Sequence, residues 1–221
     1  MIDVAVITLF PGFFSGPTGV GVVAKAVQTG AMDLSFINLR EYGIGVHRQV
    51  DDAPFGGGAG MLLMPGPLAD AIESRLHTHK VLLTPAGRPL RQSTLDRLAG
   101  YEALTLVCGR YEGVDERFVE EFIDEEVSLG DFVLAGGDAA ALAVIEGVAR
   151  LLPSVLGNPR SLDNESFRDG LLEEPQYTRP AVFRGRSVPE VLVSGDHGRI
   201  ETWREAQRVE RTRERRPDLL A

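Results

Sequence analysis

The stretch from residue 104 to residue 138 carries the residue types best suited to holding a ligand. Its first apolar run, Leu104 to Cys108, predicts a buried strand that ends at Gly109. The turn that follows crowds five charged residues together, namely Arg110, Glu112, Asp115, Glu116 and Arg117. A second short strand is predicted over residues 132–134, and it ends at Gly136 and Gly137. Two strands therefore end in glycine loops.

Glycines beside strand ends let backbone groups approach a ligand closely, because no Cβ intervenes. In open α/β sheets, ligands lie just beyond the carboxyl ends of the strands. Six glycines occupy such places, at positions 87, 109, 113, 130, 136 and 137. Any one of them could be an ordinary turn position, but together they predict a site that binds its ligand through backbone groups.

The elements that must position this site alternate between strand and helix. Strand signals cover residues 2–9, 33–39, 80–83 and 104–108. Helical spacing covers residues 20–27, 67–76, 92–98, 139–152 and 200–213. This alternation predicts an α/β fold with a mostly parallel sheet covered by helices, followed by a small, mainly helical C-terminal domain.

The composition is that of an ordinary globular protein. Of the 221 residues, 43% are hydrophobic and 25% are charged, which is enough for a substantial core. Cys108 is the single cysteine, so a disulfide framework or a cysteine-based zinc cluster is excluded. With no apolar run of transmembrane length and no secretory signal, we expect a cytoplasmic protein that does not enter a membrane.

The net charge of −9 argues against a general nucleic-acid coat, because Lys and Arg supply most non-specific affinity for phosphates. Residues 199–221 nevertheless hold seven Arg against five acidic residues, so this tail carries +2 and the remainder −11. A solvated helix with pairs such as Glu201 with Arg204 and Glu205 with Arg208 would explain the tail without any function. It is still the best candidate for a basic stripe that binds RNA.

A possible dinucleotide fingerprint lies at Gly19, Gly21 and Ala24, with Glu41 at about the expected offset of ~20 residues. The fingerprint should follow its strand directly, whereas eight residues separate Phe10 from Gly19. A nicotinamide-dependent oxidoreductase is therefore an alternative of lower rank.

Residues 46–68 form a long polar, glycine-rich loop. The loop lacks the Gly-Lys-Ser/Thr ending of a nucleoside triphosphatase, and a structureless stretch of this length is typical of functional or disordered segments. Asp51 and Asp52 are candidate substrate contacts, although helix capping would also explain them.

Five sequence segments occur in the order typical of one family, namely CGRYEG, SLGDFVLAGG, LLPSVLGNPRS, EEPQYTRP and RRPDLL. They resemble the bacterial tRNA (guanine-N1)-methyltransferases of the SPOUT superfamily, and the resemblance covers nearly the whole chain. It implies methylation of guanine N1 at tRNA position 37, next to the anticodon, with S-adenosylmethionine as methyl donor. The product, 1-methylguanosine, helps to maintain the reading frame.

The resemblance also implies a deep trefoil knot at the C-terminal edge of the sheet, built from the loops at residues 84–87, 108–113 and 128–137. S-adenosylmethionine would bind there in a bent form, mostly through backbone groups. By match to the family pattern, the cofactor-binding residues are Pro85, Gly109, Leu129, Gly130, Asp131, Phe132, Val133, Leu134 and Gly136.

The chemistry requires a base and a cation. N1 of neutral guanine carries a proton, and the charge that develops on methylation spreads onto O6, so a carboxylate and a cation are needed there. The resemblance assigns the cation to Arg150 and the base to Glu165, which stands where the family has aspartate. Asp163 is the alternative base. Helix-dipole compensation or a surface ion pair would explain Arg150 without the resemblance.

Four residues are candidates for contacts with tRNA, namely Asp51, Glu112, Tyr177 and Arg179. The resemblance associates Glu112 with a possible Mg²⁺ requirement, although an ion pair with Arg110 or Arg117 is the simpler explanation. Tyr177 and Arg179 suit a stacked base and a phosphate, with domain packing as the alternative.

The resemblance implies a homodimer whose active site is shared between subunits, with the anticodon stem-loop of tRNA as partner. We expect a methyltransferase domain at residues 1–158, an interdomain linker at residues 159–169 and a tRNA-binding domain at residues 170–221. The replacement of the family's aspartate by Glu165 leaves a third possibility, a catalytically silent tRNA-binding module.

Overall fold

The computed structural model describes residues 1–158, 162 and 165–220 and divides the chain into two compact units, Met1–Gly157 and Asn158–Ala221. We describe each unit by itself. The expected boundary near residue 158 falls beside this division. The expected linker at residues 159–169 includes positions 159–161 and 163–164, which lie outside the described residues.

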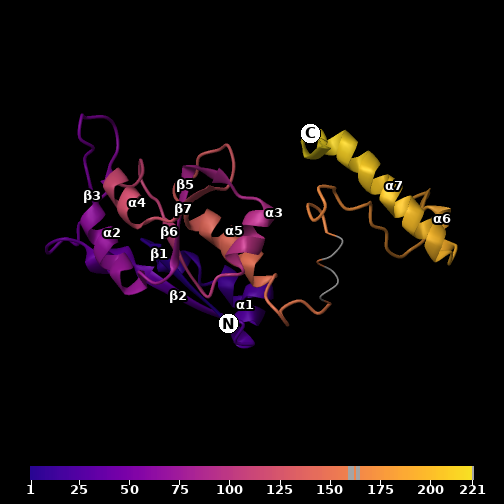
Figure 1. Cartoon of the computed structure of the whole chain (residues 1–221), viewed down its shortest axis with the longest axis horizontal. Coiled ribbons are helices and arrows are strands. Elements are labelled where there is room, and N and C mark those ends of the chain that lie inside the picture. The colour runs from indigo at the N-terminus through magenta and orange to yellow at the C-terminus, as the bar shows by residue number, and fades with distance from the viewer. Residues whose placement is uncertain (159–161, 163–164, 221) are drawn as a thin grey trace. The chain divides into compact units, whose positions relative to one another are not determined.

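The first unit is built on a parallel sheet of five strands in the order β2-β1-β6-β5-β7 (Figure 1). Its strands are β1 (Ile2–Thr8), β2 (Met32–Asn38), β5 (His79–Pro89), β6 (Ala103–Cys108) and β7 (Glu125–Ser128). Every neighbouring pair in this sheet is parallel, as the alternating pattern predicts. The α/β fold with a parallel sheet is thereby confirmed.

Helices cover both faces of the sheet (Figure 1). They are α1 (Gly21–Gln28), α2 (Pro65–Ile72), α3 (Gln92–Leu98), α4 (Glu116–Phe122) and α5 (Asp138–Ala149). Alternate residues of β1 explain the two layers, because Val4 and Val6 pack with α1 and α5 whereas Ile7 packs with α2 and α4. The unit therefore has two apolar cores, one on each side of the sheet.

One strand prediction is wrong, and two elements were missed. Residues 132–134 form no strand but an exposed loop, in which Val133 is 83% exposed. The strand at this edge is instead β7, and α4 precedes it. The acidic start of β7 hides its strand character in the sequence, because Glu125 is compatible with the sheet only once Arg97 and His79 pair with it.

The glycine-rich loop is more ordered than its composition suggests. Two short strands, β3 (Asp51–Asp52) and β4 (Leu62–Leu63), pair in antiparallel fashion. The helix α2 begins at Pro65, directly after β4. The side chain of Asp52 accepts a hydrogen bond from the backbone N–H of Ala53 at 2.8 Å, so it caps the hairpin loop rather than a helix.

The second unit is dominated by α7 (His197–Arg215), with the short helix α6 (Glu190–Val193) and a small hairpin of β8 (Val182–Phe183) and β9 (Arg186–Ser187). Of the two expected ion pairs on α7, Glu205 with Arg208 is present at 3.2 Å. Arg204 instead pairs with Glu174 at 3.3 Å, which fastens the irregular segment before β8 to the helix. Within the described part of the chain, every helix is too short or too polar to cross a bilayer.

Candidate functional site

Three loops meet at the carboxyl edge of the sheet, at the ends of β5, β6 and β7. The backbone N–H of Gly137 donates to the carbonyl of Gly109 at 2.9 Å, and Arg110 and Gly136 form an isolated antiparallel bridge. The ladder between β5 and β7 shifts register between Leu83 and Arg88, so residues 84–87 leave the sheet as an excursion. These are the three loops from which the resemblance implies a knot. The threading itself stays a prediction.

Close backbone approach explains two of the glycines. A Cβ on Gly137 would lie 2.9 Å from Cα of Cys108 and 3.0 Å from Cβ of Leu83, a separation that real side chains do not adopt. A Cβ on Gly87 would collide with the backbone of Val127. The loops pack against each other at these points without any side chain between them.

The three loops enclose a cavity of about 450 Å³, within the ~300–1,000 Å³ usual for sites of small ligands. Seven of the nine predicted cofactor residues line it, namely Pro85, Gly109, Leu129, Phe132, Val133, Leu134 and Gly136. Gly130 and Asp131 belong to the same loop but are not part of the lining. The structure therefore brings most of the predicted residues together, and their role in binding stays a prediction.

An ion pair between a buried carboxylate and a half-buried guanidinium lies at this cavity. The carboxylate of Asp138, which is 2% exposed, accepts hydrogen bonds from Nη2 and Nε of Arg110 at 2.7 and 3.1 Å. It also accepts one from the hydroxyl of Thr8 at the end of β1. Burial, and then the negative charge of Asp138, raise the pKa of the Cys108 thiol well above its usual value. Cys108 is thus a neutral core side chain and no nucleophile.

Glu112 lines the same cavity, and its side chain lies against Gly60 of the hairpin loop, where a Cβ would collide with it. The two arginines considered as its partners pair elsewhere, Arg110 with Asp138 and Arg117 with Asp115 at 2.7 Å each. Asp51 is half-buried in β3. Among the described residues, no group of three or more His, Cys, Asp or Glu side chains is arranged to hold a metal ion.

Arg150 lies at the opposite end of α5 from the cavity. Among the residues of α5, Ala140, near the start of the helix, is the one that lines the cavity. Arg150 follows the end of the helix as its C-cap. The ten intervening steps correspond to ~15 Å along the axis. An arginine side chain cannot span that distance back to the cavity of its own chain.

Glu165 lies in the second unit, half-buried, at the start of a segment that is held against α7. Nη2 of Arg208 donates to both carboxylate oxygens of Asp169, at 2.5 Å to Oδ1 and 2.6 Å to Oδ2, and this lowers the pKa of Asp169. The backbone N–H of Leu172 donates to the hydroxyl of Thr212 at 2.8 Å. Glu165 therefore has a locally fixed neighbourhood. Asp163, the alternative base, lies outside the described residues.

The second unit has a cavity of its own, of about 510 Å³, lined by Tyr177, Arg179 and Trp203 among others. The ring centroids of Tyr177 and Trp203 are 6.4 Å apart, and Tyr177 is 49% exposed. Both predicted tRNA contacts of this unit therefore lie at one concave surface.

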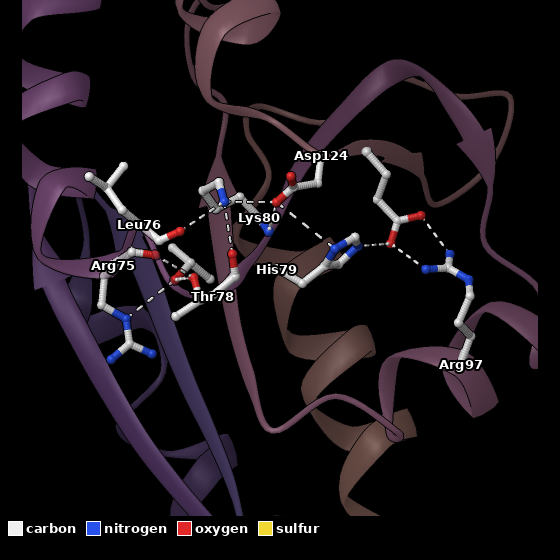
Figure 2. Close-up of polar contacts among 9 residues, drawn as sticks. Arg75, Leu76, Thr78, His79, Lys80, Arg97 and Asp124 are labelled. Carbon is white, nitrogen blue, oxygen red and sulfur yellow. Dashed lines mark hydrogen bonds and ion pairs between the residues drawn. The ribbon is translucent and has the colours of Figure 1, made fainter.

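The amino edge of the sheet carries a second charged cluster, which Figure 2 shows between β5, α3 and the start of β7. The ring of His79 stacks on Tyr101 at 4.2 Å and pairs with Glu125 at 2.9 Å. Lys80 pairs with Asp124 at 2.9 Å and donates to the carbonyl of Thr78 at 2.8 Å. The cluster satisfies its charges internally.

The possible dinucleotide fingerprint has the wrong surroundings. Two 3₁₀ turns, Pro11–Phe13 and Pro17–Gly19, separate β1 from Gly21, where α1 begins. The strand, tight turn and helix that such a motif requires are therefore not consecutive.

Comparison with known proteins settles the family. A model of the family described as tRNA (Guanine-1)-methyltransferase TrmD matches residues 2–221. The chain belongs to this family. A tRNA (guanine-N(1)-)-methyltransferase of Ruegeria pomeroyi is 52% identical, covering 97% of this chain and 90% of that protein. One of Gloeobacter violaceus is 53% identical, covering 97% and 96%. TrmD family membership confirms the resemblance, and with the geometry around Gly21 it rejects the oxidoreductase alternative.

Sequence reasoning missed the part that Thr8 and Asp138 play beside the cavity of this TrmD family member. Both residues stand at element ends on the carboxyl edge, Thr8 at the last position of β1 and Asp138 at the first of α5. An acidic residue that directly follows two glycines and begins a helix, as Asp138 does, is a signal in the sequence for a buried ion pair or hydrogen bond at this edge. Only the fold shows that Arg110 and Thr8 lie within reach of it.

Proposed function

We propose that this chain transfers a methyl group from S-adenosylmethionine to N1 of guanosine 37 in tRNA, in the cytoplasm. The observation that carries the proposal is the cavity at the three loops, lined by seven predicted cofactor residues, in a chain that belongs to the TrmD family from residue 2 to residue 221.

The cavity fits S-adenosylmethionine in size and in chemical character. Phe132, Val133 and Leu134 are 54%, 83% and 43% exposed and offer an apolar wall for an adenine ring. Gly109 and Gly136 line the cavity without side chains, so no Cβ of theirs keeps the polar parts of the ligand away from the backbone there. When bound, the cofactor supplies an electrophilic methyl group on its sulfonium.

Glu165 is the proposed general base that removes the proton from guanine N1. A carboxylate suits this role because the proton leaves as the nitrogen becomes a nucleophile. Arg150 is the proposed cation that stabilises the negative charge developing on O6. Asp163 remains the alternative base. Within its unit, the carbonyl of Glu165 accepts the backbone N–H of Arg168 at 3.3 Å, next to the pair of Asp169 with Arg208.

The position of Arg150 supports a homodimer with a shared active site. Because it lies ~15 Å along α5 from the cavity of its own chain, it can act only at a cavity supplied by a second copy. The target base would then lie between the cofactor of one subunit and Arg150 and Glu165 of the other.

The second unit is the proposed tRNA-binding part. Tyr177 offers a ring for an unstacked base and Arg179 a planar guanidinium for a phosphate, both at the cavity that contains Trp203.

Asp51 and Glu112 are proposed contacts of the first unit with the substrate. Glu112 alone does not fit a resident Mg²⁺, because a single exposed carboxylate leaves most of the coordination sphere to water and substrate oxygens.

The direct test is transfer of labelled methyl groups to an unmodified tRNA transcript. We expect about one methyl group per tRNA, a block to primer extension at position 37, and no transfer when that guanosine is replaced by adenosine. Transfer to another nucleotide would contradict the assignment to guanosine 37, and no transfer at all under conditions in which tRNA binds would support the silent binding module instead.

The role assignments have their own variants. Glu165→Gln and Arg150→Ala should each lower turnover by about 10²-fold or more, the usual size for a lost acid–base or charge-stabilising group. Their affinity for S-adenosylmethionine should not change. Glu190→Gln, an exposed carboxylate at the start of α6, is the matched control and should leave turnover unchanged.

A further inference from the structure

The buried pair of Asp138 and Arg110 connects three segments that the sequence keeps far apart. Asp138 begins α5, Arg110 follows β6, and Thr8 ends β1 and donates its hydroxyl proton to Asp138. The Thr8 oxygen in turn accepts the backbone N–H of Phe10 at 2.9 Å, and the guanidinium of Arg110 lies 4.5 Å from the centroid of the Phe10 ring. The chain of contacts closes on itself.

The same arginine holds the loop that lines the cavity. Nη1 of Arg110 donates to the carbonyl of Ala135 at 3.1 Å, and the guanidinium covers Gly136 so closely that a Cβ there would collide with it. Ala135 and Gly136 follow directly after Phe132, Val133 and Leu134, the apolar wall of the cavity. The position of that wall therefore depends on where Arg110 points.

Asp138 determines where Arg110 points. Its carboxylate is 2% exposed and lies at the N-terminus of α5, where the helix dipole favours a negative charge. Two of the guanidinium nitrogens donate to this carboxylate and the third to the carbonyl of Ala135. Arg110 therefore links Asp138 to the loop. Neither Asp138 nor Thr8 lines the cavity.

We propose that Asp138 and Thr8 are positioning residues for cofactor binding, which act through Arg110 to hold the loop of residues 129–136 in its binding conformation. The proposal rests on the proposed function, since it takes the cavity as the site of S-adenosylmethionine. Asp138 and Thr8 thus affect the affinity for S-adenosylmethionine without contacting it.

The amino edge of the same sheet offers matched controls. Thr105 is as buried as Thr8, at 0% against 1% exposure, and its hydroxyl is paired with that of Thr78 at 2.7 Å. Glu125 accepts hydrogen bonds from two nitrogens of Arg97, one on each oxygen, and Asp138 accepts from two nitrogens of Arg110, both on Oδ2. Thr105→Val and Glu125→Gln thus remove the same groups as Thr8→Val and Asp138→Asn, but away from the cavity.

The test measures the Kd of S-adenosylmethionine by calorimetry for the full-length chain, at a temperature where circular dichroism shows each variant to be folded. Asp138→Asn should raise Kd about tenfold or more, the equivalent of one good hydrogen bond lost at the ligand. Thr8→Val should raise it less. In steady-state assays the KM for S-adenosylmethionine should rise while the KM for tRNA stays the same. The two control variants should bind as wild type does.

Combining Thr8→Val with Asp138→Asn adds a test of connection. If both residues act through Arg110, the double variant should lose no more affinity than Asp138→Asn alone, because the network is already broken. Additive losses would overturn the proposal. So would wild-type affinity in folded Asp138→Asn, or an equal loss in Glu125→Gln, which would trace the effect to general destabilisation.

The wild-type chain separates this inference from the function beneath it. Tight binding by the wild type together with unchanged binding by the variants overturns the positioning role alone. Failure of the wild type to bind S-adenosylmethionine overturns both.

Discussion

The two edges of the parallel sheet use similar charged groups for different ends. At the amino edge, Lys80, His79 and Arg97 meet Asp124 and Glu125 in a cluster whose members satisfy one another (Figure 2). At the carboxyl edge, Arg110 and Asp138 are paired beneath three glycine loops, and a cavity of about 450 Å³ lies beside them. At the carboxyl edge the ion pair fixes a loop beside a cavity, whereas at the amino edge the pairs join β5, α3 and the start of β7 to one another.

The largest difference should appear in stability. Asp138→Ala leaves Arg110 without its buried partner and should lower the free energy of unfolding by about 3–5 kcal/mol. Glu125→Ala should cost only about 1 kcal/mol, because the side chain of Arg97 is 45% exposed and is hydrated when unpaired. Urea unfolding followed by circular dichroism measures both. Equal losses would remove the distinction between the edges.

A methyl group at Gly137 should separate the edges next. Gly137→Ala forces Cβ against Cys108 and Leu83 and should cost about 1–3 kcal/mol by overpacking. It should also weaken S-adenosylmethionine binding, since the loops on both sides must shift. Gly12→Ala, in the 3₁₀ turn Pro11–Phe13 with nothing within 4 Å of the added atom, is the control and should change neither quantity. A neutral Gly137→Ala would refute the close packing of the loops.

The amino edge should respond to acid. Burial alone would raise the pKa of Glu125, but hydrogen bonds from Arg97 and His79 outweigh it and hold that pKa below its ordinary value. Lys80 likewise outweighs burial and holds the pKa of Asp124 below its ordinary value. Because both values are lower in the folded chain, the stabilisation is present at neutral pH and is lost as pH falls below about 4.5.

Urea unfolding between pH 3 and pH 7 measures this loss. The decline toward acid pH should be shallower in Glu125→Gln, in which the carboxyl group is absent. An identical slope in wild type and variant would show that Glu125 contributes nothing to it.

The smallest effect on stability should accompany a clear effect on binding. Val133→Ser changes an 83% exposed side chain, so the free energy of unfolding should stay within about 0.5 kcal/mol. The Kd of S-adenosylmethionine should rise about fivefold, since an apolar contact of roughly 1 kcal/mol is lost. Leu76→Ser, at a 55% exposed position near the amino edge, is the control for affinity. Unchanged binding by Val133→Ser would remove this loop from the site.

The sequence predicts the carboxyl edge better than the amino edge, for a physical reason. Apolar runs such as Leu104 to Cys108 predict buried strands, and glycines mark where they end, so a ligand site at this edge follows from local signals. The individual cofactor residues come from the family resemblance, and the strand expected over residues 132–134 is a loop. Glu125 belongs to β7 only because Arg97, 28 residues away, neutralises it. The partnership of Thr8 and Asp138 spans 130 residues and depends on the strand order. Such pairings arise from the fold, not from any local pattern.

The most direct test of the central claim is a crystal structure of the chain with S-adenosylmethionine or its demethylated product. The account predicts the ligand in the cavity at the carboxyl edge, with its polar groups on backbone atoms of Gly109 and of residues 129–136, and its adenine against Phe132 to Leu134. A ligand bound at the amino edge, beside Gly21, or only in the C-terminal unit would contradict it.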